Sequence, residues 1–145
     1  MAFRPYLAFA GNCRDAFTRY QEVFGGELVL LAMGDMPHEG DTPPDPAAAD
    51  LIGHAALMVG DEVLMGADAP PGAMQHGVQG MCVTRSMGSV DEAGRVFDAL
   101  AEGGELQMPL GPTFFSPAFG MCIDRFGTPW MLMVEDPEMS GMPET

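Results

Sequence analysis

The chain has 145 residues, 47% of them hydrophobic, which is typical of one globular domain that needs no disulfide or structural metal to bury a core. Its 21 acidic and 6 basic residues give a formal net charge of −15, which repels nucleic-acid phosphates and anionic lipid, so we expect no nucleic-acid or membrane partner. Without a long apolar run or a secretory signal at the N-terminus, the sequence predicts a cytoplasmic location.

The first half of the chain begins with a predicted strand and an amphipathic helix. The apolar run at residues 6–9 indicates a strand that ends before Gly11, and Asn12 is a suitable N-cap for the helix that follows. Apolar residues recur at helical spacing from Ala16 to Phe24, and Gly25-Gly26 predicts the end of the helix.

Three further strands complete this half. We expect them over residues 27–33, 54–59 and 63–67, the last two joined as a hairpin by Gly60-Asp61. Between the first and second of these strands, residues 34–50 are rich in acidic residues and proline and are predicted to form an exposed loop.

The second half of the chain repeats this order of elements. A strand is expected over residues 78–85, a helix begins at the capping box Ser89-Val90-Asp91-Glu92, and Gly103-Gly104 ends that helix. Strands follow over residues 105–110, 119–123 and 129–135, with a loop at residues 111–117.

The repeat is visible in the residues themselves. Gly25-Gly26-Glu27-Leu28 matches Gly103-Gly104-Glu105-Leu106, and each match follows a helix and precedes three strands. The predicted fold is therefore α+β, a single domain of two βαβββ modules whose curled mixed sheets form a shared cleft, the usual place for a ligand. Module one is expected over residues 1–68, a linker over 69–77, module two over 78–136 and a tail over 137–145.

Cys13, Cys82 and Cys122 are an odd number of cysteines and lack the CxxC spacing of a metal site. Because all three lie among apolar residues, we expect them to be buried free thiols, as is usual in a reducing compartment.

A resemblance to a known family is carried by residues 11–17, 20, 23–27, 54–55, 64–65, 68, 97, 100, 102–104, 108–110, 120–121, 124–127 and 129–130. With these residues the chain resembles the PhnB-like branch of the vicinal-oxygen-chelate superfamily, which contains glyoxalase I, bleomycin- and fosfomycin-resistance proteins and extradiol dioxygenases. This branch also bears the label 3-demethylubiquinone-9 3-methyltransferase-like. The resemblance implies the glyoxalase/bleomycin-resistance-like fold.

Candidate site residues follow from this resemblance and from strand alternation. His54 is interpreted as a catalytic base or polar ligand contact, or else as a structural hydrogen-bonding residue. Asp68 either orients His54 and contacts ligand or caps the following loop. The predicted ligand-binding cleft is lined by Tyr6, Gln79 and Met131, with the loop aromatics Phe114 and Phe115 covering a ligand or contacting a second subunit.

A metal site is disfavoured by the same positions. Metal enzymes of the superfamily place His, Glu or Gln on the first and last strand of each module, whereas these strands here carry mainly methionine, leucine, alanine and tyrosine. Thioether and alkyl groups do not hold a hard divalent ion, so only Gln79 and Glu135 are candidate ligands. We therefore expect no cofactor.

The predicted function is a PhnB-like small-molecule-binding protein or enzyme of unknown substrate that lacks a catalytic metal. One alternative is a metal-dependent lyase or dioxygenase that uses Gln79, Glu135 and His54. A second alternative is a drug- or metabolite-sequestering protein of the resistance type. Short curled sheets with exposed edges predict a homodimer, and the small-molecule partner is expected in an apolar cleft.

Overall fold

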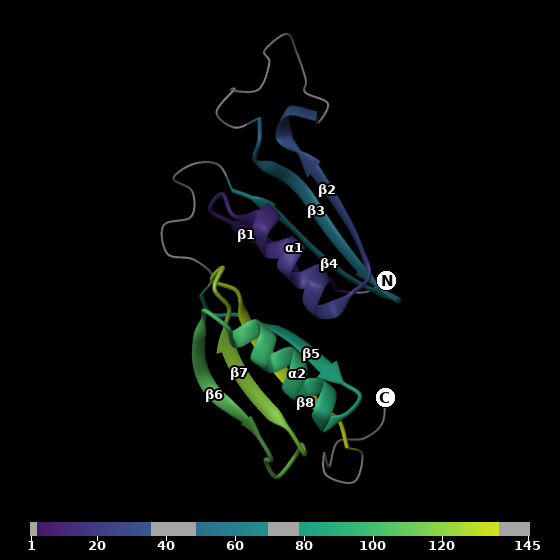
Figure 1. Ribbon diagram of the computed structural model, residues 1–145, viewed down its shortest axis with the longest axis vertical. Helices are drawn as coiled ribbons and strands as arrows, with labels where there is room; N and C mark the ends of the chain where they lie inside the picture. The colour runs from purple at the N-terminus through teal and green to yellow at the C-terminus, as the bar shows by residue number, and fades with distance from the viewer. Residues whose placement is uncertain (1–2, 36–48, 70–78, 137–145) are drawn as a thin grey trace. The chain divides into compact units, whose positions relative to one another are not determined.

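The computed structural model describes residues 3–35, 49–69 and 79–136 (Figure 1). Most of the predicted loop 34–50, most of the predicted linker 69–77 and the whole predicted tail 137–145 lie outside these ranges. The chain divides into two compact units, Met1–Gly77 and Val78–Thr145, which are described one at a time. Among the residues described, no helix is long and apolar enough to cross a membrane.

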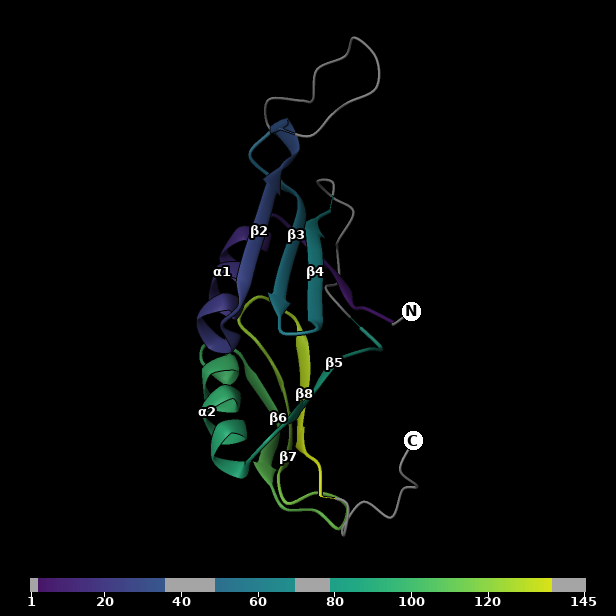
Figure 2. The same cartoon turned by 90° about the vertical axis from the view of Figure 1, so that its right-hand side faces the viewer.

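The first module is a four-stranded mixed sheet with one helix on one face, as Figures 1 and 2 show. The strands lie in the order β1-β4-β3-β2, and the β1–β4 pair is parallel while the other two pairs are antiparallel. Its elements are β1 (Tyr6–Phe9), α1 (Cys13–Phe24), β2 (Glu27–Ala32), the 3₁₀ turn η1 (Met33–Asp35), β3 (Ile52–Val59) and β4 (Glu62–Asp68).

The second module has the same topology. Its strands lie in the order β5-β8-β7-β6, with β5 and β8 parallel, and α2 covers one face of the sheet (Figure 2). Its elements are β5 (Val83–Met87), α2 (Val90–Ala101), β6 (Glu105–Gly111), β7 (Phe119–Ile123) and β8 (Pro129–Val134). The predicted α+β fold of two βαβββ modules is confirmed.

Each helix packs its apolar side against the sheet of its own module. In the first module, Phe17 of α1 is fully buried and lies so close to Gly66 of β4 that a Cβ there would clash with its ring. In the second, Phe97 of α2 lies in the same way against Gly120 of β7. These glycines let each helix approach its sheet closely, and Trp130 is buried in the second core.

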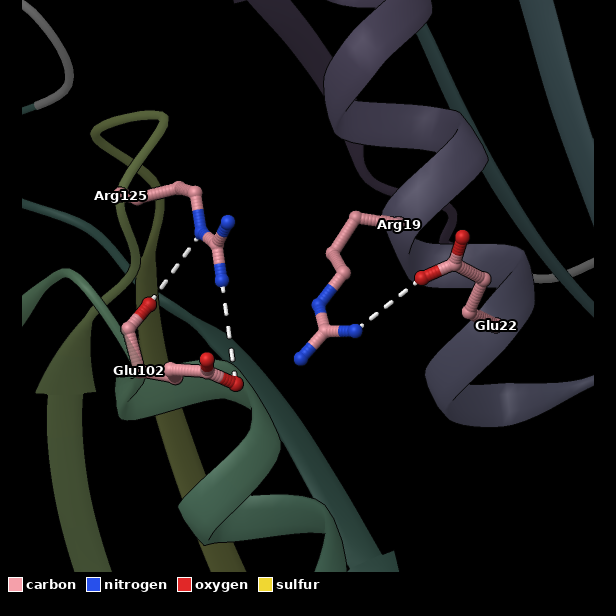
Figure 3. Close-up of polar contacts among 4 residues, drawn as sticks. All are labelled: Arg19, Glu22, Glu102 and Arg125. Carbon is pink, nitrogen blue, oxygen red and sulfur yellow. Dashed lines mark hydrogen bonds and ion pairs between the residues drawn. The ribbon is translucent and has the colours of Figure 1, made fainter.

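Side-chain contacts stabilise both ends of α2. Ser89 caps α2 as predicted, because its Oγ accepts a hydrogen bond from the backbone N–H of Glu92 at 3.1 Å. At the other end of α2, Nε of Arg125 donates to the carbonyl oxygen of Glu102 at 3.2 Å, and Nη2 lies 3.9 Å from Oε2 of Glu102 (Figure 3). This cation neutralises the carbonyl end of the helix and ties it to the β7–β8 turn. On α1, Arg19 pairs with Glu22, also in Figure 3.

The repeated Gly-Gly pair has the same structural role in both modules. A Cβ on Gly26 would lie less than 3.0 Å from the carbonyl oxygen of Met58 in β3, and a Cβ on Gly104 would lie equally close to the carbonyl oxygen of Ile123 in β7. Met58 and Ile123 occupy equivalent positions in the two sheets. The second glycine of each pair therefore lets the chain pass from helix to edge strand directly against a neighbouring strand.

One predicted boundary is wrong and moves a candidate site residue. The strand expected over residues 78–85 is β5 at Val83–Met87, so Gln79 precedes the sheet. Gly80 has a φ of 76°, which is left-handed backbone and incompatible with an extended strand. Met81 and Cys82 therefore lie just before the sheet.

The close approach of Gly104 gives the first testable prediction. We expect Gly104→Ala to lower the free energy of unfolding by about 1–3 kcal/mol, because its Cβ meets backbone atoms of Ile123 and Asp124 that side-chain rotation cannot move away. Urea unfolding followed by circular dichroism measures the change.

The matched control is Gly94→Ala in α2, where a Cβ meets no atom within 4 Å. Since alanine favours helix over glycine, this variant should gain about 0.5–1 kcal/mol. Equal effects of the two substitutions would show that the close approach does not constrain the module.

Candidate functional site

The face of each sheet that is turned away from its helix is the candidate site, and we call it the helix-free face. Side chains alternate along a strand, so the residues that flank the helix-packed ones in β1, β3 and β4 lie on this face. In the first module this face is formed by two rows of side chains that run across the strands. One row consists of Tyr6, Met65, Ala56 and Val29, and the neighbouring row consists of Ala8, Ala67, His54 and Leu31. The face is largely apolar.

The helix-free face of the second module is rich in methionine. Thr84 stands opposite Met131, which stands opposite Met121, which in turn stands opposite Met108. The next row runs from Ser86 through Met133 and Phe119 to Gly111. Methionine is flexible and polarisable, so this face can adapt to apolar bodies of different shapes.

Tyr6 and His54 form a polar pair on the first of these faces. The phenol oxygen of Tyr6 is hydrogen-bonded to Nδ1 of His54 at 3.2 Å, and the two ring centroids lie 5.9 Å apart at a tilt of 31°. Tyr6 is 51% exposed and His54 half-buried. The contact brings two candidate residues from β1 and β3 together, across the intervening strand β4.

Asp68 lies elsewhere, on the helix side of β4. Its side chain is buried, with the residue 4% exposed, and Oδ1 accepts hydrogen bonds from the backbone N–H groups of Gly11 at 3.1 Å and Cys13 at 3.0 Å. Oδ2 accepts from the N–H of Ile52 at 2.8 Å. The carboxylate thus holds the start of α1, where Asn12 makes no side-chain cap, and this geometry favours a structural role over orientation of His54.

Asp124 is the buried carboxylate of the second module and has a different role, because it closes the β7–β8 turn; it was not among the predicted site residues. Its Oδ1 accepts from the N–H groups of Phe126 and Thr128, and Oδ2 accepts from Nε1 of Trp130 at 2.8 Å. The sequence at residues 124–127 is typical of a turn. The hydrogen bond between Asp124 and Trp130 is seen only in the fold.

The aromatic loop residues extend the helix-free face of the second module. Phe115 packs edge-on against Phe119 with centroids 5.1 Å apart, and Phe114 packs in the same manner against Phe115 at 5.1 Å. Phe114 is 89% exposed. The hydroxyl of the buried Ser116 lies within hydrogen-bond distance of the carbonyls of Ala118 (2.7 Å) and Val134 (2.6 Å), which anchors this loop to the sheet.

The strand positions do not fit a hard divalent metal. Gln79 precedes β5, and the helix-free positions of that strand carry Thr84 and Ser86 instead. Those of β8 carry Met131 and Met133, and Glu135 follows at its end, where Oε1 accepts a hydrogen bond from Ser86 at 3.0 Å. Within the described part of the chain, no group of three or more His, Cys, Asp or Glu residues is arranged to hold a metal ion. At these strand positions one carboxylate is surrounded by thioether and hydroxyl groups, which are poor ligands for a hard divalent ion.

The cysteines differ in exposure. Cys13 and Cys122 are fully buried as predicted, whereas Cys82 is partly exposed, because it lies just before β5 and outside the core. Burial, reinforced by the nearby Asp68 charge, raises the pKa of the Cys13 thiol to about 12. Burial together with Asp124 raises the pKa of Cys122 to about 11. Neither buried thiol is a nucleophile at neutral pH.

Two repeated βαβββ modules, each with a helix on one sheet face and a largely apolar opposite face, define a protein of the glyoxalase type. Residues 3–132 match the family model of the Glyoxalase/Bleomycin resistance protein/Dioxygenase superfamily, and the chain belongs to this superfamily.

Individual relatives agree with this assignment. The chain is 33% identical over 141 residues to protein YjdN of Escherichia coli strain K12, covering 92% of this chain and 95% of YjdN. It is similar to the crystal structure of protein PA1353 from Pseudomonas aeruginosa, with a TM-score of 0.83, 45% identity and coverage of 93% and 98%. A putative 3-demethylubiquinone-9 3-methyltransferase, PhnB protein, from Bacillus cereus shares the fold, with a TM-score of 0.70, 22% identity and coverage of 92% and 99%.

The position of Asp68 predicts a large effect on stability. We expect Asp68→Ala to lower the free energy of unfolding by about 3 kcal/mol, because three backbone N–H groups lose a charged acceptor. Chemical denaturation measures the loss. Asp15→Ala, at an exposed position in the first turn of α1, is the control and should change stability by less than about 1 kcal/mol. A fully stable Asp68→Ala protein would contradict the structural role.

Cysteine exposure predicts the thiol count of the native protein. At about pH 8, Ellman's reagent should react rapidly with one thiol per chain, Cys82, because the other two are buried and protonated. All three should react in denaturant. In the native Cys82→Ser variant, rapid reaction should disappear, and a thiol that still reacts would show that a core cysteine is accessible.

Proposed function

We propose that this protein binds a small molecule with an apolar body on its helix-free sheet faces, without a catalytic metal. The observation that carries the proposal is the set of side chains on these faces. Alkyl groups, thioethers and aromatic rings predominate, and they are interrupted by the hydrogen-bonded pair of Tyr6 and His54. A mostly apolar surface with a few convergent polar groups is the usual composition of a small-molecule site.

Tyr6 and His54 supply the polar contact of the proposed site. Nδ1 of His54 is hydrogen-bonded to the Tyr6 phenol, which orients the imidazole, and in this proposal Nε2 makes the hydrogen bond to the ligand. The same pair is the only acid–base combination that we assign to catalysis if the ligand is transformed. Asp68 has no part in this proposal, since its carboxylate is occupied by backbone N–H groups.

The proposal includes no catalytic metal because of the chemistry of the available donors. The first and last strands of the two modules present tyrosine, alanine, threonine, serine and methionine on their helix-free faces. Among the described residues beyond β8, Glu135 is the carboxylate that continues the helix-free alternation of the strand, whereas hard divalent ions require several oxygen or nitrogen ligands. A shared cleft between the modules stays a prediction from the repeat.

A homodimer in the cytoplasm is part of the same proposal. Each sheet has an edge strand with exposed apolar side chains, Val29 on β2 and Leu106 and Met108 on β6. Edge strands of this kind are commonly covered by a second subunit, and an isologous contact would bury the same strand twice.

A ligand screen on protein treated with a chelator tests the proposed function. We expect apolar metabolites or drugs to raise the melting temperature of the metal-free protein, because ligand bound to the folded state stabilises it. Tyr6→Phe should weaken binding of such a ligand by about 2–10-fold, the effect of one lost hydrogen bond. Titration calorimetry measures the affinities.

Thr18→Ala is the matched control, since it also removes one hydroxyl but from the exposed side of α1. It should leave affinity unchanged. Stoichiometric metal in the purified protein, with ligand binding that is lost on chelation, would overturn the proposal. Recovery of the ligand intact indicates sequestration, and its consumption with dependence on His54 indicates catalysis.

A further inference from the structure

The helix-free face of the second module ends in a carboxylate. Glu135 lies one residue beyond β8 and is exposed, and Oγ of Ser86 donates a hydrogen bond to its Oε1 at 3.0 Å. Ser86 stands directly opposite Met133, and Met133 stands opposite Phe119. The bond to Ser86 therefore places one carboxylate oxygen at the end of the row formed by Ser86, Met133 and Phe119.

The apolar part of this row is built from polarisable groups. Phe119, Phe115 and Phe114 form a chain of edge-to-face contacts, each with centroids 5.1 Å apart. Met133 stands opposite Phe119, and Met131 lies two residues earlier in β8 on the same face of the sheet, opposite Met121. Aromatic faces attract cations through their quadrupole, and methionine sulfur is polarisable, so both prefer a soft organic cation to an anion.

No basic side chain of the described part of this module lies on the same face. Arg85 alternates with Thr84 and Ser86 and stands opposite the buried Leu132, on the side of the sheet that α2 covers. Arg95 belongs to α2, and Arg125 contacts Glu102 at the end of that helix. Ser86 is the polar partner of the Glu135 side chain within the residues described.

We propose, on the basis of the function proposed above, that the helix-free face of the second module selects organic cations that carry an aromatic or aliphatic body. The cationic nitrogen lies near Glu135, and the body lies against Met133, Met131 and Phe119. The net charge of −15 adds a long-range attraction for the same sign of ligand. Anionic small molecules are disfavoured because this face offers them no counter-charge.

Three probes that share one aromatic body test this selectivity: (1-naphthylmethyl)trimethylammonium, 1-naphthalenemethanol and 1-naphthylacetate. We expect the cation to bind more tightly than the alcohol, and the alcohol more tightly than the carboxylate, in fluorescence or calorimetric titrations. Glu135→Gln should weaken binding of the cation by about fivefold, the effect of one exposed charge pair, and leave binding of the alcohol unchanged.

Asp98→Asn is the control for net charge, because it removes one negative charge from the exposed side of α2. If Asp98→Asn weakens binding of the cation as much as Glu135→Gln does, the long-range electrostatic field selects the ligand and the assignment to Glu135 is wrong. Equal affinity for cation and alcohol, with no effect of Glu135→Gln, overturns the selectivity but leaves the proposed function intact. Failure of all three probes to bind counts against both.

Discussion

Each module has one buried carboxylate that binds backbone N–H groups next to its strands, and the candidate site depends on the register of those strands. Asp68 connects the end of β4 to the start of α1 and to β3 through three backbone N–H groups. Asp124 closes the turn between β7 and β8 and binds the indole of Trp130. A slip of one residue would turn every side chain of a strand to the opposite face. It would expose Trp130 and bury Met131, so the register decides both the core and the proposed binding surface.

The order of elements could be read from the sequence because its signals are local. Gly-Gly stops, the Ser89 cap and apolar periodicity each depend on neighbouring residues, and the structure has them where they were expected. The start of β5 was misplaced because the left-handed Gly80 interrupts an otherwise strand-like run. For Asp68 the sequence indicated either orientation of His54 with ligand contact or capping of the following loop. It did not indicate the capping of α1, because the partners Cys13 and Gly11 lie 55 and 57 residues away. Contacts of that range appear only in the fold.

Residues of the candidate site could be predicted where the alternation of side chains along a strand alone decides which face of the sheet they occupy. Tyr6 and Met131 lie on helix-free faces, and the loop pair Phe114 and Phe115 adjoins one of them through Phe119. The hydrogen bond between Tyr6 and His54 joins strands that are not neighbours, so no spacing along the chain indicates it. The strand register of the second module is needed to place four further residues on its helix-free face: Thr84, Ser86, Met108 and Met121.

The two modules use equivalent positions for different chemistry. Where the first sheet has Tyr6 opposite Met65, the second has Thr84 opposite Met131, and the position of His54 corresponds to Phe119. The first face thus retains a hydrogen-bonding pair, and the second replaces it with an aromatic ring beside thioethers. The helix-packed faces of both remain apolar because the core of each module requires it. Since the helix of each module packs only on the opposite face of its sheet, the duplicated fold can keep its architecture while the two helix-free faces carry different side chains.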